Sequence, residues 1–185
     1  MLEISYDTIG ATVRAYNMAW KRQEEENMEN LVLTRIDDRL IHGQVMTAWI
    51  KNKGADQVVI VDDGVAKDDF MINVLENAVP DNIAIGIFSK EDAVTFFSEP
   101  LEAPTIILAK TPQTLEYMVD NGISIDEIDL GGMGAKAGRE RLYHTISTNA
   151  EENESFKRLI EKGVDAFIQI MPQNEKVNLK DILNK

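Results

Sequence analysis

The stretch Leu31-Val-Leu-Thr34 followed by Arg35-Ile-Asp-Asp-Arg-Leu-Ile-His42-Gly-Gln-Val45 contains the most informative residues of the chain. The short apolar run predicts a strand, and the apolar positions from Val45 onward predict a helix. The polar residues between them therefore lie at a strand-to-helix turn. A neutral imidazole is a nucleophile near pH 7, since its unperturbed pKa is about 6.5. We therefore expect a solvent-exposed His42, beside the fixed charge of Arg39, to be able to receive a phosphoryl group.

The composition indicates one globular domain. The chain has 185 residues, 44% of them hydrophobic, which is enough to bury a sizeable core. Its formal net charge of −13 argues against binding to nucleic acid or to anionic lipid. The absence of cysteine excludes disulfides, thiol nucleophiles and cysteine-type zinc sites. Since the sequence has no apolar run of ~20 residues and no secretory signal pattern, we expect a cytoplasmic protein.

From residue 31 onward, short apolar runs alternate with helix-period segments. The strands are predicted at Leu31–Thr34, Gln57–Val61, Ile83–Phe88, Thr105–Ala109, Ile125–Leu130, Tyr143–Ser147 and Ala166–Ile170. The helix signals lie at Val45–Gly54, Phe70–Ala78, Ser89–Phe97, Thr111–Gly122, Glu151–Gly163 and Asn178–Asp181. This alternation predicts an α/β fold with an open, mainly parallel sheet of about seven strands and helices on both faces.

Residues 1–30 do not follow this rhythm. They contain a candidate helix with Val13, Tyr16 and Trp20 along one side, followed by a polar run to Asn27. This segment is either an extension that contributes little to the fold or a helix for packing or oligomerisation, and the sequence leaves both open. Residues 31–185 are predicted to form a single domain.

The turn offers a set of groups suited to phosphoryl transfer, which requires positioned donors and stabilised charge. Arg39 carries a planar fork of donors, and an aspartate could orient Arg39 or the imidazole of His42. Asp37 is the preferred aspartate and Asp38 the weaker alternative. Gly43 would allow the backbone to approach a ligand closely. We therefore predict His42, Arg39 and Asp37 as catalytic residues.

Further phosphate-binding residues are expected around this centre. Ligands of parallel sheets bind beyond the carboxyl ends of the strands, so the Asp62-Asp63 loop is predicted to be a neighbour of the 36–43 loop. The full set of expected phosphate-binding residues is Arg35, Asp38, Gly43, Gln44, Asp62 and Asp63.

Other interpretations of the same residues remain open at this point. Asp37 and Asp38 could form a turn that Arg39 closes by salt bridges, with His42 as a helix cap. Two carboxylates and a histidine could also bind zinc or magnesium, although no second histidine stands at a ligand-like offset. We predict no metal site.

Three features elsewhere carry weaker predictions. The run Gly131-Gly132-Met133-Gly134 lacks the lysine-serine pair of a phosphate-binding P-loop, so we expect close backbone packing there. His144 is predicted to be a structural residue within a strand. Arg139 and Arg141 are predicted to be solvated or to face a partner.

The motif Arg35–Val45 resembles the active-site loop of the IIB component of the mannose/fructose/sorbose class of the phosphoenolpyruvate-dependent sugar phosphotransferase system. The resemblance runs from about Leu31 to the C-terminus. Supporting matches lie at Val59–Lys67, Lys110–Pro112, Asp129–Met133 and Glu161–Val164.

The resemblance implies a role for each residue of the loop. His42 would accept a phosphoryl group, through Nδ1, from a phosphohistidine of the IIA component. It would then pass the group to a sugar delivered by the membrane components IIC and IID. Arg39 would steady the phosphoryl group and Asp37 would assist. The implied protein is a protein-phosphohistidine–sugar phosphotransferase without cofactor or metal, cytoplasmic and peripherally associated with its permease.

One departure from the family pattern concerns Asp62, since the family often has Asn-Asp where this chain has Asp62-Asp63. Asp62 would repel a phosphorylated His42 unless Arg39 or Lys67 screens it. Two competing functions also remain: a regulatory module whose phosphorylation state is read by a partner protein, and a small-anion-binding domain. The identity of the sugar and the formation of a homo-oligomer are not readable from the sequence.

Overall fold

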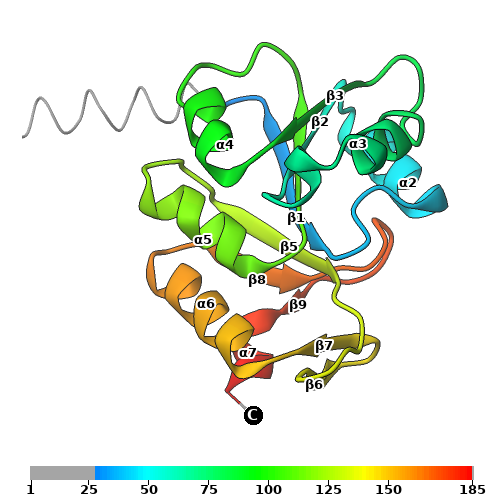
Figure 1. The fold of residues 1–185 in the computed structure, drawn as a ribbon. Helices are drawn as coiled ribbons and strands as arrows, with labels where there is room; N and C mark the ends of the chain where they lie inside the picture. Colours follow the sequence, from blue (N-terminus) through cyan, green and yellow to red (C-terminus); the bar gives the residue numbers. More distant parts are fainter. Residues whose placement is uncertain (1–27, 185) are drawn as a thin grey trace, which may run out of the picture.

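A seven-stranded sheet forms the centre of the molecule in the computed structural model, which describes residues 28–184 apart from the side chains of Gln44 and Val45. Its strand order is β3-β2-β4-β1-β5-β8-β9 (Figure 1). All neighbouring strands are parallel except β8 and β9. The strands are β1 Leu31–Asp37, β2 Gln57–Val61, β3 Ala84–Phe88, β4 Thr105–Ala109, β5 Glu127–Gly132, β8 Asp165–Ile168 and β9 Val177–Asn178. The predicted fold class is confirmed. The helix expected around Val13, Tyr16 and Trp20 lies outside the described residues.

Helices cover both faces of this sheet. They are α2 Gly43–Lys53, α3 Asp69–Glu76, α4 Lys90–Phe97, α5 Pro112–Asp120, α6 Ala150–Glu161 and α7 Leu179–Leu183, with a short 3₁₀ helix η1 at Val65–Lys67. One buried cluster joins the sheet to α4, α5, α6 and α7, and a second joins it to α2 and α3 (Figure 1). Val59 and Val61 belong to the first cluster, whereas Val58 and Ile60 belong to the second. Burial on both faces explains why the strands are continuously apolar.

One predicted strand is wrong. The run Tyr143–Ser147 is not a strand of the main sheet, because β6 (Glu140–Tyr143) and β7 (Ile146–Thr148) form a separate antiparallel hairpin around it. His144 lies exposed at the turn with φ 45°, so it is not the structural strand residue that was expected. A short apolar run does not distinguish one strand from the two halves of a tight hairpin. The seventh place in the sheet belongs instead to β9.

The carboxyl ends of three adjacent strands form the edge that contains the candidate residues. β1 is longer than predicted, so Arg35 and Asp37 are strand residues rather than loop residues. Ala109 of β4 is in register with Ile36 of β1 on one side and with Val61 of β2 on the other. The loops after β1 and β2, which were predicted to be neighbours, therefore lie at the same edge of the sheet, with the end of β4 between them. The strand order changes direction between β1 and β4, which is where open α/β sheets bind their ligands.

Candidate functional site

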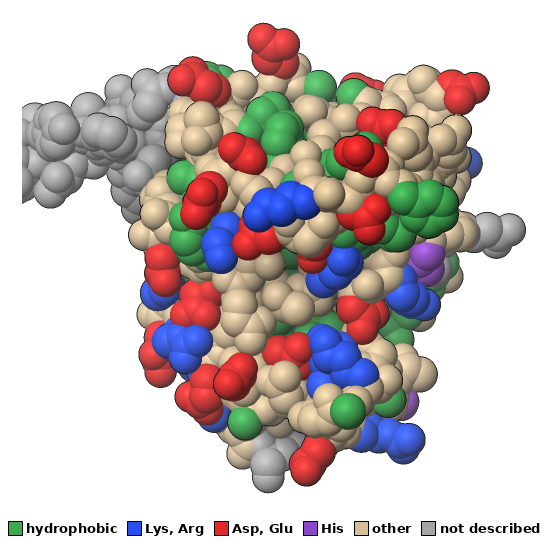
Figure 2. Space-filling view, viewed as in Figure 1, with side chains coloured by type: hydrophobic (Ala, Val, Ile, Leu, Met, Phe, Trp, Pro, Cys, Tyr) green, Lys and Arg blue, Asp and Glu red, His purple; other side chains and the backbone are tan. Residues whose placement is uncertain are grey.

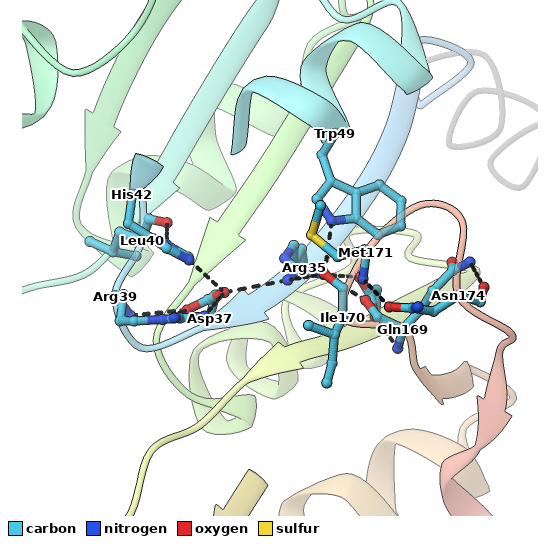
Figure 3. A network of polar contacts seen from close by, with 11 residues as sticks. Arg35, Asp37, Arg39, Leu40, His42, Trp49, Gln169, Ile170, Met171 and Asn174 are labelled. Carbon is cyan, nitrogen blue, oxygen red and sulfur yellow. Dashed lines mark hydrogen bonds and ion pairs between the residues drawn. The ribbon is translucent and has the colours of Figure 1, made fainter. Parts of the chain in front are cut away.

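Asp37 is the centre of the polar network at the end of β1 (Figure 3). Its carboxylate is fully buried. Oδ1 accepts hydrogen bonds from the backbone N–H of Arg39 at 3.2 Å and from its Nε at 3.1 Å. Oδ2 accepts from Nη2 of Arg39 at 3.2 Å and from Nη2 of Arg35 at 3.4 Å. A buried carboxylate needs such compensation, and here two guanidinium groups provide it.

The imidazole of His42 packs beside this carboxylate (Figure 3). Its Nδ1 lies 3.0 Å from the carbonyl oxygen of Leu40, which can only accept, so Nδ1 carries a proton in this arrangement. Nε2 lies 3.8 Å from Oδ2 of Asp37 and is buried without a hydrogen-bond partner. The side chain is 23% exposed, so the ring is partly buried. From the sequence, a ring that is fully exposed to solvent was expected.

Leu40 determines the shape of the loop between Asp37 and His42. Its N–H donates to the carbonyl oxygen of Asp37 at 2.9 Å, which closes a tight turn. Its backbone has φ 55°, a left-handed conformation that leucine rarely adopts, while its side chain is buried in the core beneath α2. The loop conformation therefore depends on the burial of this side chain.

The N-terminus of α2 faces the same edge. His42 is the N-cap residue, but its side chain accepts no hydrogen bond from the first turn, and this turn has no acidic residue. Gly43 begins the helix with φ 44°, and nothing lies within 4 Å of a Cβ built on it. The backbone conformation of this residue therefore favours glycine, and the space beside it is free of protein atoms. Gln44 lies in this first turn, and its side chain is outside the described part of the structure.

Arg35 lies beneath the loop and not in contact with solvent. Its side chain is 1% exposed. It forms an ion pair with Asp129 of β5. It also donates to the carbonyl oxygens of Gln169 at 2.9 Å and Ile170 at 3.2 Å (Figure 3). Its guanidinium also lies over the ring of Trp49 in α2, at 5.2 Å from the ring centroid. A phosphoryl group cannot reach this side chain, so its expected role as a direct phosphate ligand is not compatible with its burial.

The two glycines at the end of β5 make room for these arginines. A Cβ on Gly131 would lie 1.7 Å from Cζ of Arg35, and a Cβ on Gly132 would lie 2.9 Å from Oδ1 of Asp37. The predicted close packing of this segment is confirmed.

Burial raises the pKa of Asp129 to about 6, although the charge of Arg35 acts in the opposite direction.

Asp38 binds the segment between β5 and β6. Its Oδ2 accepts from the backbone N–H of Gly134 at 2.8 Å and from Nη1 of Arg139 at 3.0 Å. The side chain of Arg139 is fully buried and also binds Glu152, whose Oε1 accepts from Nη2 at 2.6 Å. Burial opposes the charge of Arg139, but hydrogen bonds to Glu152 and Asp38 raise its pKa. The expectation that Arg139 is solvated or faces a partner is wrong. Arg141, for which the same was expected, is exposed.

The two aspartates after β2 bind lysines on neighbouring strand ends. Asp62 caps the turn by accepting from the N–H of Val65 at 2.8 Å, and its Oδ1 lies 3.3 Å from Nζ of Lys110. Asp63 accepts from the backbone N–H of Lys90 at 2.8 Å, which lowers the pKa of Asp63. The cation that screens Asp62 is therefore Lys110, rather than Arg39 or Lys67.

Basic side chains lie next to the histidines at the surface. Figure 2 shows histidine side chains along one edge of the molecule with lysine or arginine side chains next to them, whereas acidic side chains dominate the rest of this face. Arg39 is 54% exposed at its side chain and so presents charge to solvent beside the loop. Among residues 28–184, no group of three or more histidine, aspartate or glutamate side chains is arranged to hold a metal ion. Within the same residues, no helix has the length and apolar character needed to cross a bilayer.

Comparison with known proteins identifies a family that covers the whole described fold. The family model of the PTS system sorbose subfamily IIB component matches residues 31–185. The sorbose-specific EIIB component of Klebsiella pneumoniae is 31% identical over 157 residues, which cover 84% of this chain and 96% of the relative. The N-acetylgalactosamine-specific phosphotransferase enzyme IIB component 2 of Escherichia coli is 32% identical over 157 residues, covering 84% of this chain and 100% of the relative.

Solved structures agree with these sequence matches. The crystal structure of the IIBSor domain of the sorbose permease from Klebsiella pneumoniae superimposes with a TM-score of 0.80 at 31% identity, over 83% of this chain and 96% of that domain. The mannose-specific EIIAB component of Escherichia coli is 28% identical over 155 residues, which cover 83% of this chain and 48% of that protein. The chain therefore belongs to the sorbose subfamily of IIB components of the phosphotransferase system, a class of phosphotransferases that serves sugar transport.

Proposed function

We propose that His42 carries a phosphoryl group from a phosphohistidine of a IIA component to a sugar presented by IIC and IID membrane components. In the first step a phosphorus–nitrogen bond forms to the unprotonated ring nitrogen of His42 while the phosphorus–nitrogen bond of the donor breaks. The donor ring keeps the electron pair and takes up a proton, and His42 releases the proton of its other ring nitrogen. In the second step a sugar hydroxyl attacks phosphorus, the bond to His42 breaks, and the hydroxyl proton leaves to the released imidazole or to solvent. The observation that carries this proposal is the position of His42, braced by Asp37 at the uncapped N-terminus of α2.

The surrounding donors suit the charge of a phosphoryl group. The free N–H groups of a helix N-terminus and the helix dipole both favour an anion. Arg39 is exposed, and Asp37 fixes its orientation through Nε and Nη2. Asp37 in turn is held from below by Arg35, so Arg35 acts as a positioning residue. Little covalent chemistry is required of the protein in phosphoryl transfer, and these groups provide position and charge.

The reacting nitrogen requires a small movement of the ring. Nδ1, the acceptor implied by the family resemblance, is engaged with the carbonyl oxygen of Leu40. Phosphorylation at Nδ1 therefore requires this hydrogen bond to break, Nδ1 to turn outward, and the proton of Nδ1 to move to Nε2, so that Nδ1 has a free electron pair. A neutral hydrogen bond contributes about 1 kcal/mol net, so this movement adds little to the barrier. We infer that the described conformation is the resting state of the loop.

The partners and the location follow from the same proposal. The name of the mannose-specific EIIAB relative couples a IIA and a IIB unit, which supports a IIA component as phosphoryl donor. Residues 31–185 would act as a single IIB-like phosphotransfer domain, with residues 1–30 as an extension. We place this domain in the cytoplasm, in transient contact with IIA and with its permease.

Phosphorylation by a phosphorylated IIA component tests the proposal. We expect one acid-labile, base-stable phosphate per chain, lost in His42→Ala. The matched control is His144→Ala, because His144 is the other histidine of the chain and lies exposed at the hairpin turn. Full labelling of His42→Ala would remove His42 from the mechanism. A chain that is labelled, but is not needed for sugar phosphorylation by membrane preparations containing IIC and IID, would instead support the regulatory module.

A further inference from the structure

Lys110 lies between the two acidic residues of the site edge. β4 ends at Ala109, which is in register with Ile36 of β1 and with Val61 of β2. The next residues of the three strands are Asp37, Lys110 and Asp62. Adjacent strands are ~4.8 Å apart, so these residues form a row across the edge with the lysine in the middle.

The side chains of this row point to the face that carries α2. Ile36, Ala109 and Val61 all belong to the buried cluster on the α5 face. Successive residues of a strand point to opposite faces, so Asp37 points to the other face. Asp62 lies just beyond β2 and accepts from the N–H of Val65, a residue of the buried cluster on the α2 face. Two contacts agree with this: Lys110 pairs with Asp62 at 3.3 Å, and Arg35, two residues before Asp37, lies over Trp49 of α2. Lys110 therefore lies on the same side of the sheet as the loop that carries His42.

The cations at this edge of the sheet differ in how freely they can respond to a new charge. Arg35 is buried and bound to Asp129, Asp37 and two carbonyl oxygens. Arg39 directs Nε and Nη2 at Asp37. Lys110 is one-third exposed at the end of a flexible stem. Its ion pair with Asp62 is partly solvated, and such a pair contributes little to stability.

We propose that Lys110 is a further phosphoryl-binding residue, which leaves Asp62 and turns to the phosphoryl group when His42 is phosphorylated. A phosphoryl group brings about two negative charges to a place that already holds Asp37 and Asp62. Lys110 meets this charge and remains close enough to Asp62 to return after transfer. This inference rests on the proposed function of His42 and adds a residue that the loop motif does not contain.

The test compares Lys110→Met with Lys90→Met. Lys90 is a matched control because its Nζ lies 3.3 Å from Asp63 at the neighbouring strand end, and its side chain is 39% exposed against 33% for Lys110. Each variant removes one charge from the same edge of the sheet. We expect Lys110→Met to slow phosphorylation by phosphorylated IIA about tenfold and to speed hydrolysis of phosphorylated His42 several-fold. Lys110→Arg should restore most of the rate, and Lys90→Met should behave as the parent chain.

Ionic strength provides a second readout that a purely structural role would not change. The transfer rate of the parent chain should fall with added salt more steeply than that of Lys110→Met, because the variant has lost one attractive charge. Equal transfer rates, hydrolysis rates and salt dependences for Lys110→Met and Lys90→Met would overturn the proposal while leaving His42 in place. A parent chain that accepts no phosphate from phosphorylated IIA would overturn the role of His42 and that of Lys110 together.

Discussion

Replacing Arg139 by methionine should destabilise the fold strongly, although this side chain is remote in sequence from the loop that it supports. Arg139 donates to Glu152 through Nε at 2.9 Å and Nη2 at 2.6 Å, and to Asp38 through Nη1 at 3.0 Å. Asp38 is 26% exposed and regains water in the variant, so its loss is small. Glu152 is 3% exposed and would remain buried with the backbone N–H of Asn149 as its hydrogen-bond donor. Removal of one partner from a buried ion pair costs about 3–5 kcal/mol, and the lower half of that range is expected here.

Urea unfolding at neutral pH measures this loss as a shift of the midpoint at constant slope. The companion variant is Arg139→Met with Glu152→Gln, because glutamine can still accept from Asn149 while the unpaired charge is gone. This double variant should recover at least about 1 kcal/mol relative to Arg139→Met alone. A single variant that loses less than about 1 kcal/mol, or a double variant no better than the single one, would refute the assignment of Arg139–Glu152 as a buried, energetically coupled pair.

Two further predictions concern the buried pair beneath the loop. Gly131→Ala should lower stability by about 2 kcal/mol or more, since the new Cβ would lie 1.7 Å from Cζ of Arg35; thermal unfolding close to that of the parent chain would show that the guanidinium can move aside. For Asp129, the folded-state pKa of about 6 lies above the ordinary value of 3.8, so its contribution to stability is fully present below about pH 4 and is lost as the pH rises through 6. Between about pH 4 and pH 7 the free energy of unfolding of Asp129→Asn, measured with urea, should therefore rise relative to that of the parent chain by up to about 3 kcal/mol. If the free energy of unfolding of the parent chain rises relative to that of the variant over this range, the attraction of Arg35 outweighs the effect of burial on the pKa of Asp129.

The parts of the fold that could be predicted from sequence are those with local signals. Helix ends were readable because Ser89 accepts from the N–H of Asp92, and Gly54 ends α2 with a left-handed φ of 63°. The continuously apolar strands indicated a sheet covered on both faces. The hairpin at 140–148 was missed because its turn residue, His144, adopts a positive φ without being glycine or asparagine.

The candidate site also has a part with local sequence signals and a part without them. His42, Arg39 and Asp37 could be grouped because they lie within six residues of one another, and local geometry keeps them together. Arg139 is 101 residues from Asp38, and the sheet order brings them into contact. The place of Lys110 also depends on strand order, because β4 inserts between β1 and β2. A single sequence contains no signal for such contacts, so surface exposure was the wrong expectation for Arg139.

The conformation of Leu40 links the working loop to the hydrophobic core. A left-handed backbone costs a non-glycine residue roughly 1–2 kcal/mol, and burial of a leucine side chain returns about 1.5–3 kcal/mol. The difference between these two free energies is small. Modest loosening of the packing beneath α2 would therefore let Leu40 leave its left-handed conformation before the strands of the sheet separate. On warming, competence for group transfer should then disappear at a lower temperature than secondary structure does, and the protein would fail as a carrier while still folded.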